Sequence, residues 1–265
     1  MGNRRPGSTL EGVDLGFRGD VVEFYQRYRR GYPDAAIDAV VAEFGLGAAD
    51  VVVDLGCGTG QLTVPFARRV RAAVGVDPEP DMLAAARRAA DASNVSWVLG
   101  ADTDVPALGR LLGTVGAVTI GQALHWMDHE RLFRAVHPVV RPGGGVAVFT
   151  NGTPLWLQDT GWSRALRAFM EHYLGTRLTL TCGADEHTQR RYADALGEHF
   201  TVRHHLVEYE DDLDVEHIVG GVLSALPVDK LPSDRAAFTS ALRDVLEPHA
   251  PFTERVDVRI LTGRR

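Results

Sequence analysis

Apolar residues in the first 150 positions fall into short blocks, and the segments between these blocks have helical spacing. The blocks are short and rich in valine, which is typical of buried strands; they lie at 51–53, 72–76, 95–99, 115–120 and 146–150. The intervening patterns predict helices over 20–30, 34–44, 62–70, 78–92, 105–112 and 128–137. This alternation predicts an α/β fold: a parallel sheet with right-handed crossovers and helices on both faces.

The pattern changes after residue 150. Most of 155–199 reads as helical, with a second helix beginning at Asp185, and further helices are predicted over 214–226 and 233–246. Strands are predicted over 202–209 and 255–261, and a turn over 141–145 before the fifth strand. The second part of the chain is therefore expected to add helices and two strands to the first.

A glycine-rich turn follows the first strand in the sequence Val51-Val-Val-Asp-Leu-Gly-Cys-Gly-Thr-Gly-Gln61. Glycines allow positive φ and leave room for a ligand. Asp54 precedes the turn and Asp77 ends the next strand. These carboxylates would repel a pyrophosphate but hold an ammonium group and a ribose diol, which favours S-adenosylmethionine. A dinucleotide motif would also place its third glycine one position later.

The sequence Val53-Asp-Leu-Gly-Cys-Gly-Thr-Gly60, followed by Gly75-Val76-Asp77, resembles the cofactor motifs of class I S-adenosylmethionine-dependent methyltransferases. The resemblance implies a Rossmann-like, seven-stranded, mostly parallel sheet with its last strand antiparallel, and a helical lid insertion. It implies S-adenosylmethionine as cofactor, with S-adenosylhomocysteine as product, bound by Asp54, Gly56, Cys57, Gly58, Gly60, Gln61 and Asp77. The alternatives are a non-catalytic protein that keeps the cofactor fold, and an NAD(P)-dependent oxidoreductase.

The segment from Tyr25 to Pro33 resembles a Tyr-x-x-x-Arg-x-Gly-Tyr-Pro sequence that closes over the cofactor in a small-molecule branch of this superfamily. The resemblance implies that Tyr25 and Arg29 contact the cofactor carboxylate and that Tyr32 contacts the acceptor. A guanidinium is the preferred partner of a carboxylate. The alternative is a solvated basic turn packed by its tyrosines.

The adenine end of the cofactor is expected beside two other segments. Met82 follows Asp77 by one helical turn and either lies against the adenine ring or packs in the core. Ala101, Asp102 and Thr103 follow the third strand, where the family usually places an acid for the adenine amino group. Here Ala101 takes the usual place of the acid, and a backbone amide remains available for a ring nitrogen.

The segment Gly121-Gln-Ala-Leu-His-Trp-Met-Asp128 follows the fourth strand and resembles the Leu-His-Trp segment of small-molecule methyltransferases related to those acting on trans-aconitate. This implies that Gln122 and His125 lie beside the cofactor and that Trp126 contacts the acceptor. His125 is either a general base, with Tyr25 as a second catalytic candidate, or a packed structural residue. His125 and His129 lack the glutamate of a zinc protease helix, so no metal site is expected.

Length and composition limit the remaining possibilities. A chain of 265 residues fits one core domain with an elaboration: a flexible tail over 1–19, a cofactor-binding core over 20–150, and lid insertions with the last two strands over 151–265. Aromatic residues in the insertion, namely Trp156, Trp162 and Phe169, either contact the acceptor or form the lid core.

Charge and cysteine content favour a small-molecule acceptor. The net charge of −7 argues against nucleic acid or an anionic membrane as partner. Cys57 and Cys182 do not form a disulfide framework, and no apolar run is long enough to span a bilayer. We therefore expect a cytoplasmic enzyme that methylates a small molecule, in the setting of secondary metabolism.

Overall fold

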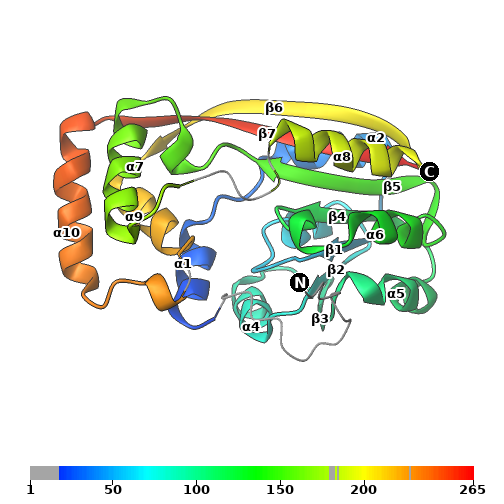
Figure 1. Cartoon of the computed structure of the whole chain (residues 1–265). Coiled ribbons are helices and arrows are strands. Elements are labelled where there is room, and N and C mark those ends of the chain that lie inside the picture. Colours follow the sequence, from blue (N-terminus) through cyan, green and yellow to red (C-terminus); the bar gives the residue numbers. More distant parts are fainter. Residues whose placement is uncertain (1–17, 179–182, 184, 227) are drawn as a thin grey trace, which may run out of the picture.

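A seven-stranded sheet of order β3-β2-β1-β4-β5-β7-β6 organises the protein (Figure 1). The computed structural model describes residues 18–178, 183, 185–226 and 228–265. Of the predicted tail over 1–19, only residues 18 and 19 are among the described residues. Cys182 also lies outside the described residues. The strands are β1 Val51–Leu55, β2 Ala72–Asp77, β3 Val95–Leu99, β4 Val115–Gly121, β5 Val140–Asn151, β6 Thr201–Leu213 and β7 Phe252–Arg264.

The pairing confirms the predicted sheet. Strands β1 to β5 pair in parallel, and β7 lies between β5 and β6 and is antiparallel to both. The chain order reverses at β1, where β2 lies on one side and β4 on the other. In open α/β sheets ligands bind at such a reversal, outside the carboxyl ends of the strands.

Helices cover both faces of the sheet, and others stand beside it (Figure 1). They are α1 Asp20–Tyr28, α2 Asp34–Phe44, α3 Thr63–Ala67, α4 Pro80–Ala89, α5 Val105–Leu112, α6 His129–Val136, α7 Gly161–Leu174, α8 Glu186–Gly197, α9 Val215–Leu223 and α10 Arg235–Leu246. Short 3₁₀ turns are η1 Asp102–Asp104, η2 Leu124–Trp126, η3 Leu155–Leu157, η4 Val228–Lys230 and η5 Glu247–His249.

Each apolar cluster belongs to one layer. Helices α5, α6 and α8 pack on one face of the sheet, and α2 and α3 on the other. A separate cluster joins α7, α9 and α10 with η3, and we call these four elements the helical lid. Helix α1 lies between the helical lid and α4, where Val22 packs on Met82 and Ala85.

Two of the differences from the prediction concern strands. The turn expected over 141–145 is an irregular stretch inside β5, where the register with β4 shifts and Gly143 has a φ of 77°. Strand β6 continues to Leu213, because it pairs with β7 along its whole length, so Glu210, Asp211 and Asp212 lie within the strand and not after it.

Candidate active site

The glycine turn after β1 packs tightly against the ends of neighbouring strands. Gly56 has a φ of +64°, and a Cβ there would lie 2.5 Å from the Cβ of Ala123, which follows β4. A Cβ on Gly60, whose φ is +93°, would lie 2.6 Å from the Trp97 ring of β3. At both positions L side chains are excluded by backbone conformation and by space. The turn is therefore held in one shape. A Cβ on Gly58 would lie 3.7 Å from the Tyr25 ring, which is an ordinary contact distance.

Asp77 fixes this turn from the end of β2. One carboxylate oxygen accepts a hydrogen bond from the Gly58 amide at 2.8 Å, and the other accepts from the Glu79 amide at 2.9 Å. Burial raises the pKa of Asp77, and the two amides oppose that effect. A carboxylate has about four lone-pair sites, so two remain for a ribose diol.

Asp54 occupies a different environment at the end of β1. Its oxygens accept hydrogen bonds from the hydroxyls of Thr63 at 2.6 Å and Thr119 at 2.9 Å. Burial raises its pKa to about 7, with a smaller contribution from the nearby Asp77. Asp54 lines the cavity described below, as expected of a group that faces an ammonium.

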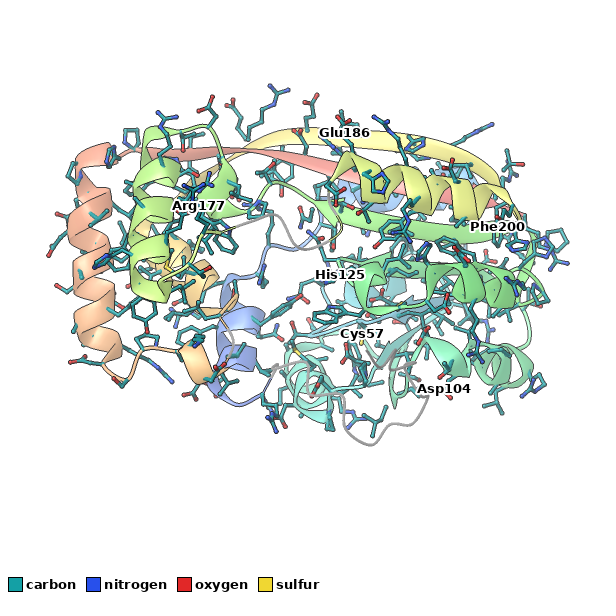
Figure 2. All side chains as sticks on the ribbon, in the orientation of Figure 1. Cys57, Asp104, His125, Arg177, Glu186 and Phe200 are labelled. Atoms are coloured by element: carbon teal, nitrogen blue, oxygen red, sulfur yellow. The ribbon has the colours of Figure 1, made fainter. Side chains whose placement is uncertain are left out.

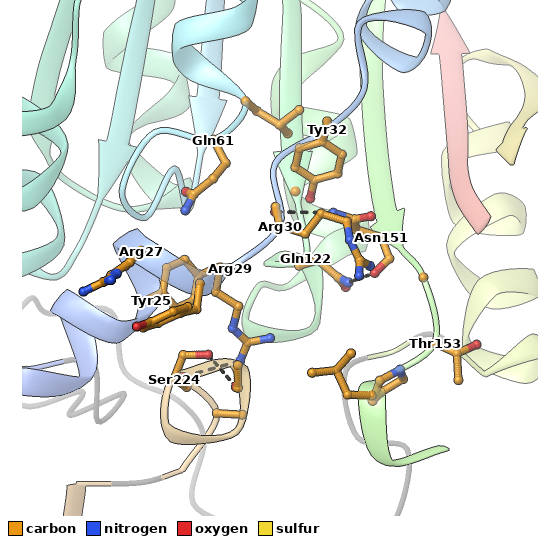
Figure 3. A pocket seen from close by; sticks show the side chains of 18 of the residues that line it. Tyr25, Arg27, Arg29, Arg30, Tyr32, Gln61, Gln122, Asn151, Thr153 and Ser224 are labelled. Atoms are coloured by element: carbon orange, nitrogen blue, oxygen red, sulfur yellow. Dashed lines mark hydrogen bonds between the residues drawn. The ribbon is translucent and has the colours of Figure 1, made fainter. Parts of the chain in front are cut away.

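A cavity of about 730 Å³ connects the glycine turn to the helical lid (Figure 3). Its volume lies within the usual range of about 300–1,000 Å³ for small-molecule sites. Among the predicted site residues, the cavity is lined by Tyr25, Arg29, Tyr32, Asp54, Gly56, Cys57, Gln61, Gln122, His125, Trp126 and Trp156. Cys57 and His125, which both line this cavity, are labelled in Figure 2.

Helix α1 closes one side of the cavity. The Arg29 guanidinium lies 5.2 Å from the Tyr25 ring centroid and donates to the Ser224 carbonyl at 3.4 Å (Figure 3). No carboxylate pairs with Arg29 within the described part of the chain. The predicted basic turn is therefore folded over the glycine turn, with a cation available for an anionic group.

The predicted adenine contacts do not line this cavity. Met82 is buried against Val22 of α1. One backbone amide of this segment, that of Ala101, donates to the Asp104 carboxylate at 2.9 Å, which closes the η1 turn. Asp102 and Thr103 lie in the same turn, and burial raises the pKa of Asp102.

His125 and Trp126 lie in η2, directly after β4. The His125 ring lines the main cavity and also a second one of about 280 Å³. Burial lowers its pKa, so the neutral form, which can accept a proton, prevails at neutral pH. Trp126 is 57% exposed and lies against His125 with ring centroids 4.9 Å apart.

The aromatic residues of the insertion separate into two groups. Trp156 lines the cavity, whereas Trp162 and Phe169 do not. The Trp162 ring is buried in the helical lid and its indole nitrogen donates to the Thr253 carbonyl at 3.2 Å. Phe169 packs on Phe238 of α10. The amphipathic pattern of α7 places both rings toward its helical neighbours, away from the cavity.

Sequence reasoning missed three polar groups of the cavity. Asn151 ends β5, and the rule that strand ends line the site would have identified it. Arg30 forms an ion pair with the buried Glu254 of β7, which also accepts a hydrogen bond from Gln158 at 2.7 Å. Ser224 follows α9. The last two depend on tertiary contacts that no local pattern reveals.

The sequence of this region matches a known family. Residues 52–144 match the methyltransferase domain family, and this range holds the glycine turn, Asp77 and the Leu-His-Trp segment. This part of the chain is a methyltransferase domain and is similar to the class I S-adenosylmethionine-dependent methyltransferases. The cofactor of this family is S-adenosylmethionine. The glycine turn, the carboxylates of Asp54 and Asp77, and the Arg29 guanidinium provide a suitable cradle for it.

Proteins described as methyltransferases are similar to this chain in sequence. The chain is 36% identical over 148 residues to an uncharacterised methyltransferase of Mycobacterium tuberculosis, covering 56% of each protein, so it spans about half the length of this relative. It is 23% identical over 253 residues to an uncharacterised methyltransferase of Schizosaccharomyces pombe, covering 93% of this chain and 94% of that protein.

The fold resembles that of a protein described as a type II methyltransferase from Anaeromyxobacter dehalogenans, with a TM-score of 0.62, 22% identity and 89% of this chain and 98% of that chain covered. No helix within the described residues is long and apolar enough to cross a membrane. Those residues also hold no cluster of three or more His, Cys, Asp or Glu side chains arranged to bind a metal ion.

Proposed function

We propose that this protein transfers the methyl group of S-adenosylmethionine to a small-molecule acceptor. The observation that supports this best is the cavity, which joins the glycine turn after β1 to the helical lid and to His125. Its volume suits part of the cofactor together with a small acceptor, and it is too small for a macromolecule. The Leu-His-Trp segment favours the small-molecule branch related to the trans-aconitate enzymes and a role in secondary metabolism.

The bound cofactor supplies a methyl group already activated on a sulfonium, so the chain mainly has to align the reactants. Alignment can provide about 7–11 kcal/mol of the barrier. In this proposal, Asp77 binds the ribose, Tyr25 and Arg29 hold the carboxylate, and the helical lid excludes water. His125 takes the proton released by the acceptor.

A cytoplasmic location is part of the proposal. Cys57 is an unpaired, buried thiol, and burial raises its pKa well above the usual range. Such a thiol is unreactive and agrees with a reducing compartment.

Calorimetry and a product assay test the proposed function. We expect S-adenosylmethionine to bind and NAD not to bind, and S-adenosylhomocysteine to appear when a library of small acceptors is supplied. Binding of NAD alone would contradict the methyltransferase function. Cofactor binding without turnover of any acceptor would favour the non-catalytic alternative.

A further inference from the structure

Residues 30–32 connect α1 to α2 beside the main cavity, and side chains hold them in place. No backbone–backbone hydrogen bond joins these three residues to another described residue. Instead the Gly31 carbonyl accepts a hydrogen bond from Asn151 Nδ2 at 2.9 Å, and the Tyr32 ring packs on an aromatic ring of β5. The Arg30 side chain reaches further, to β6 and β7. The path of this segment therefore depends on a few side-chain contacts.

Arg30 binds a buried carboxylate of the sheet. Its guanidinium forms an ion pair with Glu254 of β7, whose side chain is 0% exposed, whereas the Arg30 side chain is 22% exposed. A buried carboxylate needs a cation and further hydrogen-bond donors, because it has lost its contact with water. Removing only one partner of such a pair is strongly destabilising. Residue 30 is therefore firmly attached to β7.

The Glu254 carboxylate connects two walls of the cavity. Gln158 follows η3 and donates from Nε2 to Glu254 at 2.7 Å, so the helical lid is bound to the same carboxylate as Arg30. Asp211 of β6 lies 3.8 Å from the Arg30 guanidinium and lines the cavity. One buried group thus holds the segment after α1 against both the sheet and the helical lid.

Arg29, the cation proposed to hold the cofactor carboxylate, directly precedes this attachment. The chain leaves α1 at Arg29 in an extended conformation, with φ −75° and ψ 127°. The Arg29 guanidinium lies on the Tyr25 ring and donates to the Ser224 carbonyl at 3.4 Å, which is long for a hydrogen bond (Figure 3). Because the peptide bond between residues 29 and 30 is rigid, a shift of residue 30 also moves the backbone that carries the Arg29 side chain.

We propose that Arg30 is a positioning residue for cofactor binding and that it acts through Arg29. The ion pair with Glu254 fixes residue 30, and this places the neighbouring Arg29 guanidinium against the carboxylate of the bound cofactor. The inference rests on the proposed function, because it takes this carboxylate to be that of S-adenosylmethionine. It requires that the ion pair matters only for ligands that carry the carboxylate.

Two ligands that differ by this one group test the proposal on the full chain. They are S-adenosylhomocysteine and its decarboxylated analogue, which keeps the adenosine, the thioether and the amino group. Calorimetry on the wild-type protein should give the analogue a Kd about 10- to 100-fold higher, because charge-assisted hydrogen bonds are lost. Equal affinities would overturn the inference, since no group of the protein would then bind the carboxylate.

The double variant Arg30→Met/Glu254→Gln removes the ion pair without leaving an unpaired buried charge. S-Adenosylhomocysteine should bind about 5- to 30-fold more weakly, as expected for coupled residues, while the Kd of the analogue stays within about 2-fold. Equal losses for both ligands would show that the ion pair only stabilises the fold. An unchanged affinity for S-adenosylhomocysteine would show that Arg29 does not depend on it. Either result would overturn the inference.

The matched control is Arg141→Met/Asp50→Asn. Arg141 donates from Nε to the buried Asp50 carboxylate at 2.6 Å, and neither residue lines the cavity. This variant should lower the unfolding temperature, as the test variant does, but it should change neither Kd.

Arg30→Lys is a second test that keeps the buried charge and hence the fold. An ammonium can pair with Glu254 but lacks the planar fork of a guanidinium, so S-adenosylhomocysteine should bind about 2- to 5-fold more weakly, with the analogue unaffected. A loss shared by both ligands would overturn the inference even if the double variant did not fold.

The route through Arg29 is tested in an Arg29→Met background. There the change of Arg30 and Glu254 should no longer affect the Kd of S-adenosylhomocysteine, because the group that binds the carboxylate is gone. A further loss of about 5-fold or more would mean that Arg30 acts by another route, and the inference would fail. If the wild-type protein bound neither ligand, the proposed function itself would fail. If it bound both but the variants showed the wrong pattern, only the role of Arg30 would be contradicted.

Discussion

At the scale of single residues, Gly56 provides a direct test of the cofactor turn. Gly56→Ala must place a Cβ 2.5 Å from the Ala123 Cβ, so the turn has to move. Gly45→Ala is a matched control, because Gly45 has a similar φ of +57° and open space around its missing Cβ. Both variants should lose about 1–2 kcal/mol of unfolding free energy through backbone strain. Only Gly56→Ala should lose S-adenosylmethionine binding in calorimetry; equal affinities in the two variants would contradict the proposed cradle.

His125 has its own test at this scale. If it is the general base, His125→Ala should lower kcat by about 10² to 10⁴ while the cofactor Kd is kept. Because burial lowers the pKa of His125, the wild-type rate should fall on the acid side as pH drops through that lowered pKa. This acid limb should disappear in the variant. His204→Ala, an exposed change on β6, should leave the profile intact.

If the rate of His125→Ala still fell at low pH, another group would have to take the proton from the acceptor. Tyr25 lines the same cavity and is the next candidate. Retention of the full rate would instead mean that the acceptor needs no base, since a sulfonium donor reacts with a sufficiently nucleophilic group by proximity alone.

The sequence identified part of the cavity wall. Asp54, Gln61 and His125 lie at or after the ends of converging strands, so the family resemblance and the strand-end rule together were enough to place them. Trp162 and Phe169 show the limit of this reasoning. An aromatic side chain in an inserted helix is equally compatible with either face until its neighbours are known, and here the neighbours are α9 and α10.

At the scale of elements, the position of α1 depends on a close contact with α9. A Cβ on Gly220 would lie 2.2 Å from the Tyr28 ring, which packs at the end of α1 and lines the cavity. Gly220→Ala should therefore push α1 away from α9, at a cost of about 1–3 kcal/mol of unfolding free energy. Cofactor affinity should fall although no proposed contact is removed.

Gly197→Ala is the control for this change. Gly197 lies at the end of α8, and a Cβ there meets Val202 at an ordinary 3.7 Å. Alanine favours helices, so this variant should be neutral or slightly more stable. Urea unfolding and calorimetry with S-adenosylmethionine check both variants. A normal cofactor Kd in Gly220→Ala would show that the position of α1 does not affect the site.

The elements themselves were predictable where one local pattern dominates. Helix α2 and strand β3 have the bounds expected from apolar spacing. The stretch 141–145 was not predictable, because its glycines look like a turn but join β5 through pairing with β4 and β7. Strand β6 exceeds its apolar pattern for the same reason: pairing along β7 extends it into charged residues.

At the scale of the whole molecule, one buried acid makes the free energy of unfolding depend on pH. Asp54 lies beneath the cavity at 1% exposure, and burial raises its pKa to about 7 from an ordinary 3.8. Between these two values the folded protein binds a proton that the unfolded chain has released. The contribution of Asp54 to the free energy of unfolding therefore falls as pH rises from about 4 to about 7, and is constant above that range.

Asp54→Asn should remove this slope, because the amide does not titrate. Urea unfolding of both proteins at pH 5 and pH 8 measures the effect. Other groups also make the free energy of unfolding depend on pH, such as Asp50, whose pKa is lowered by its bond to Arg141. Because their contributions are the same in both proteins, they cancel in the comparison. The wild-type protein should lose up to about 1.4 kcal/mol per pH unit relative to the variant across the window. If the free energy of unfolding changed equally with pH in both proteins, Asp54 would be charged in the folded sheet. The hydrogen bonds from the Thr63 and Thr119 hydroxyls would then offset the cost of its burial.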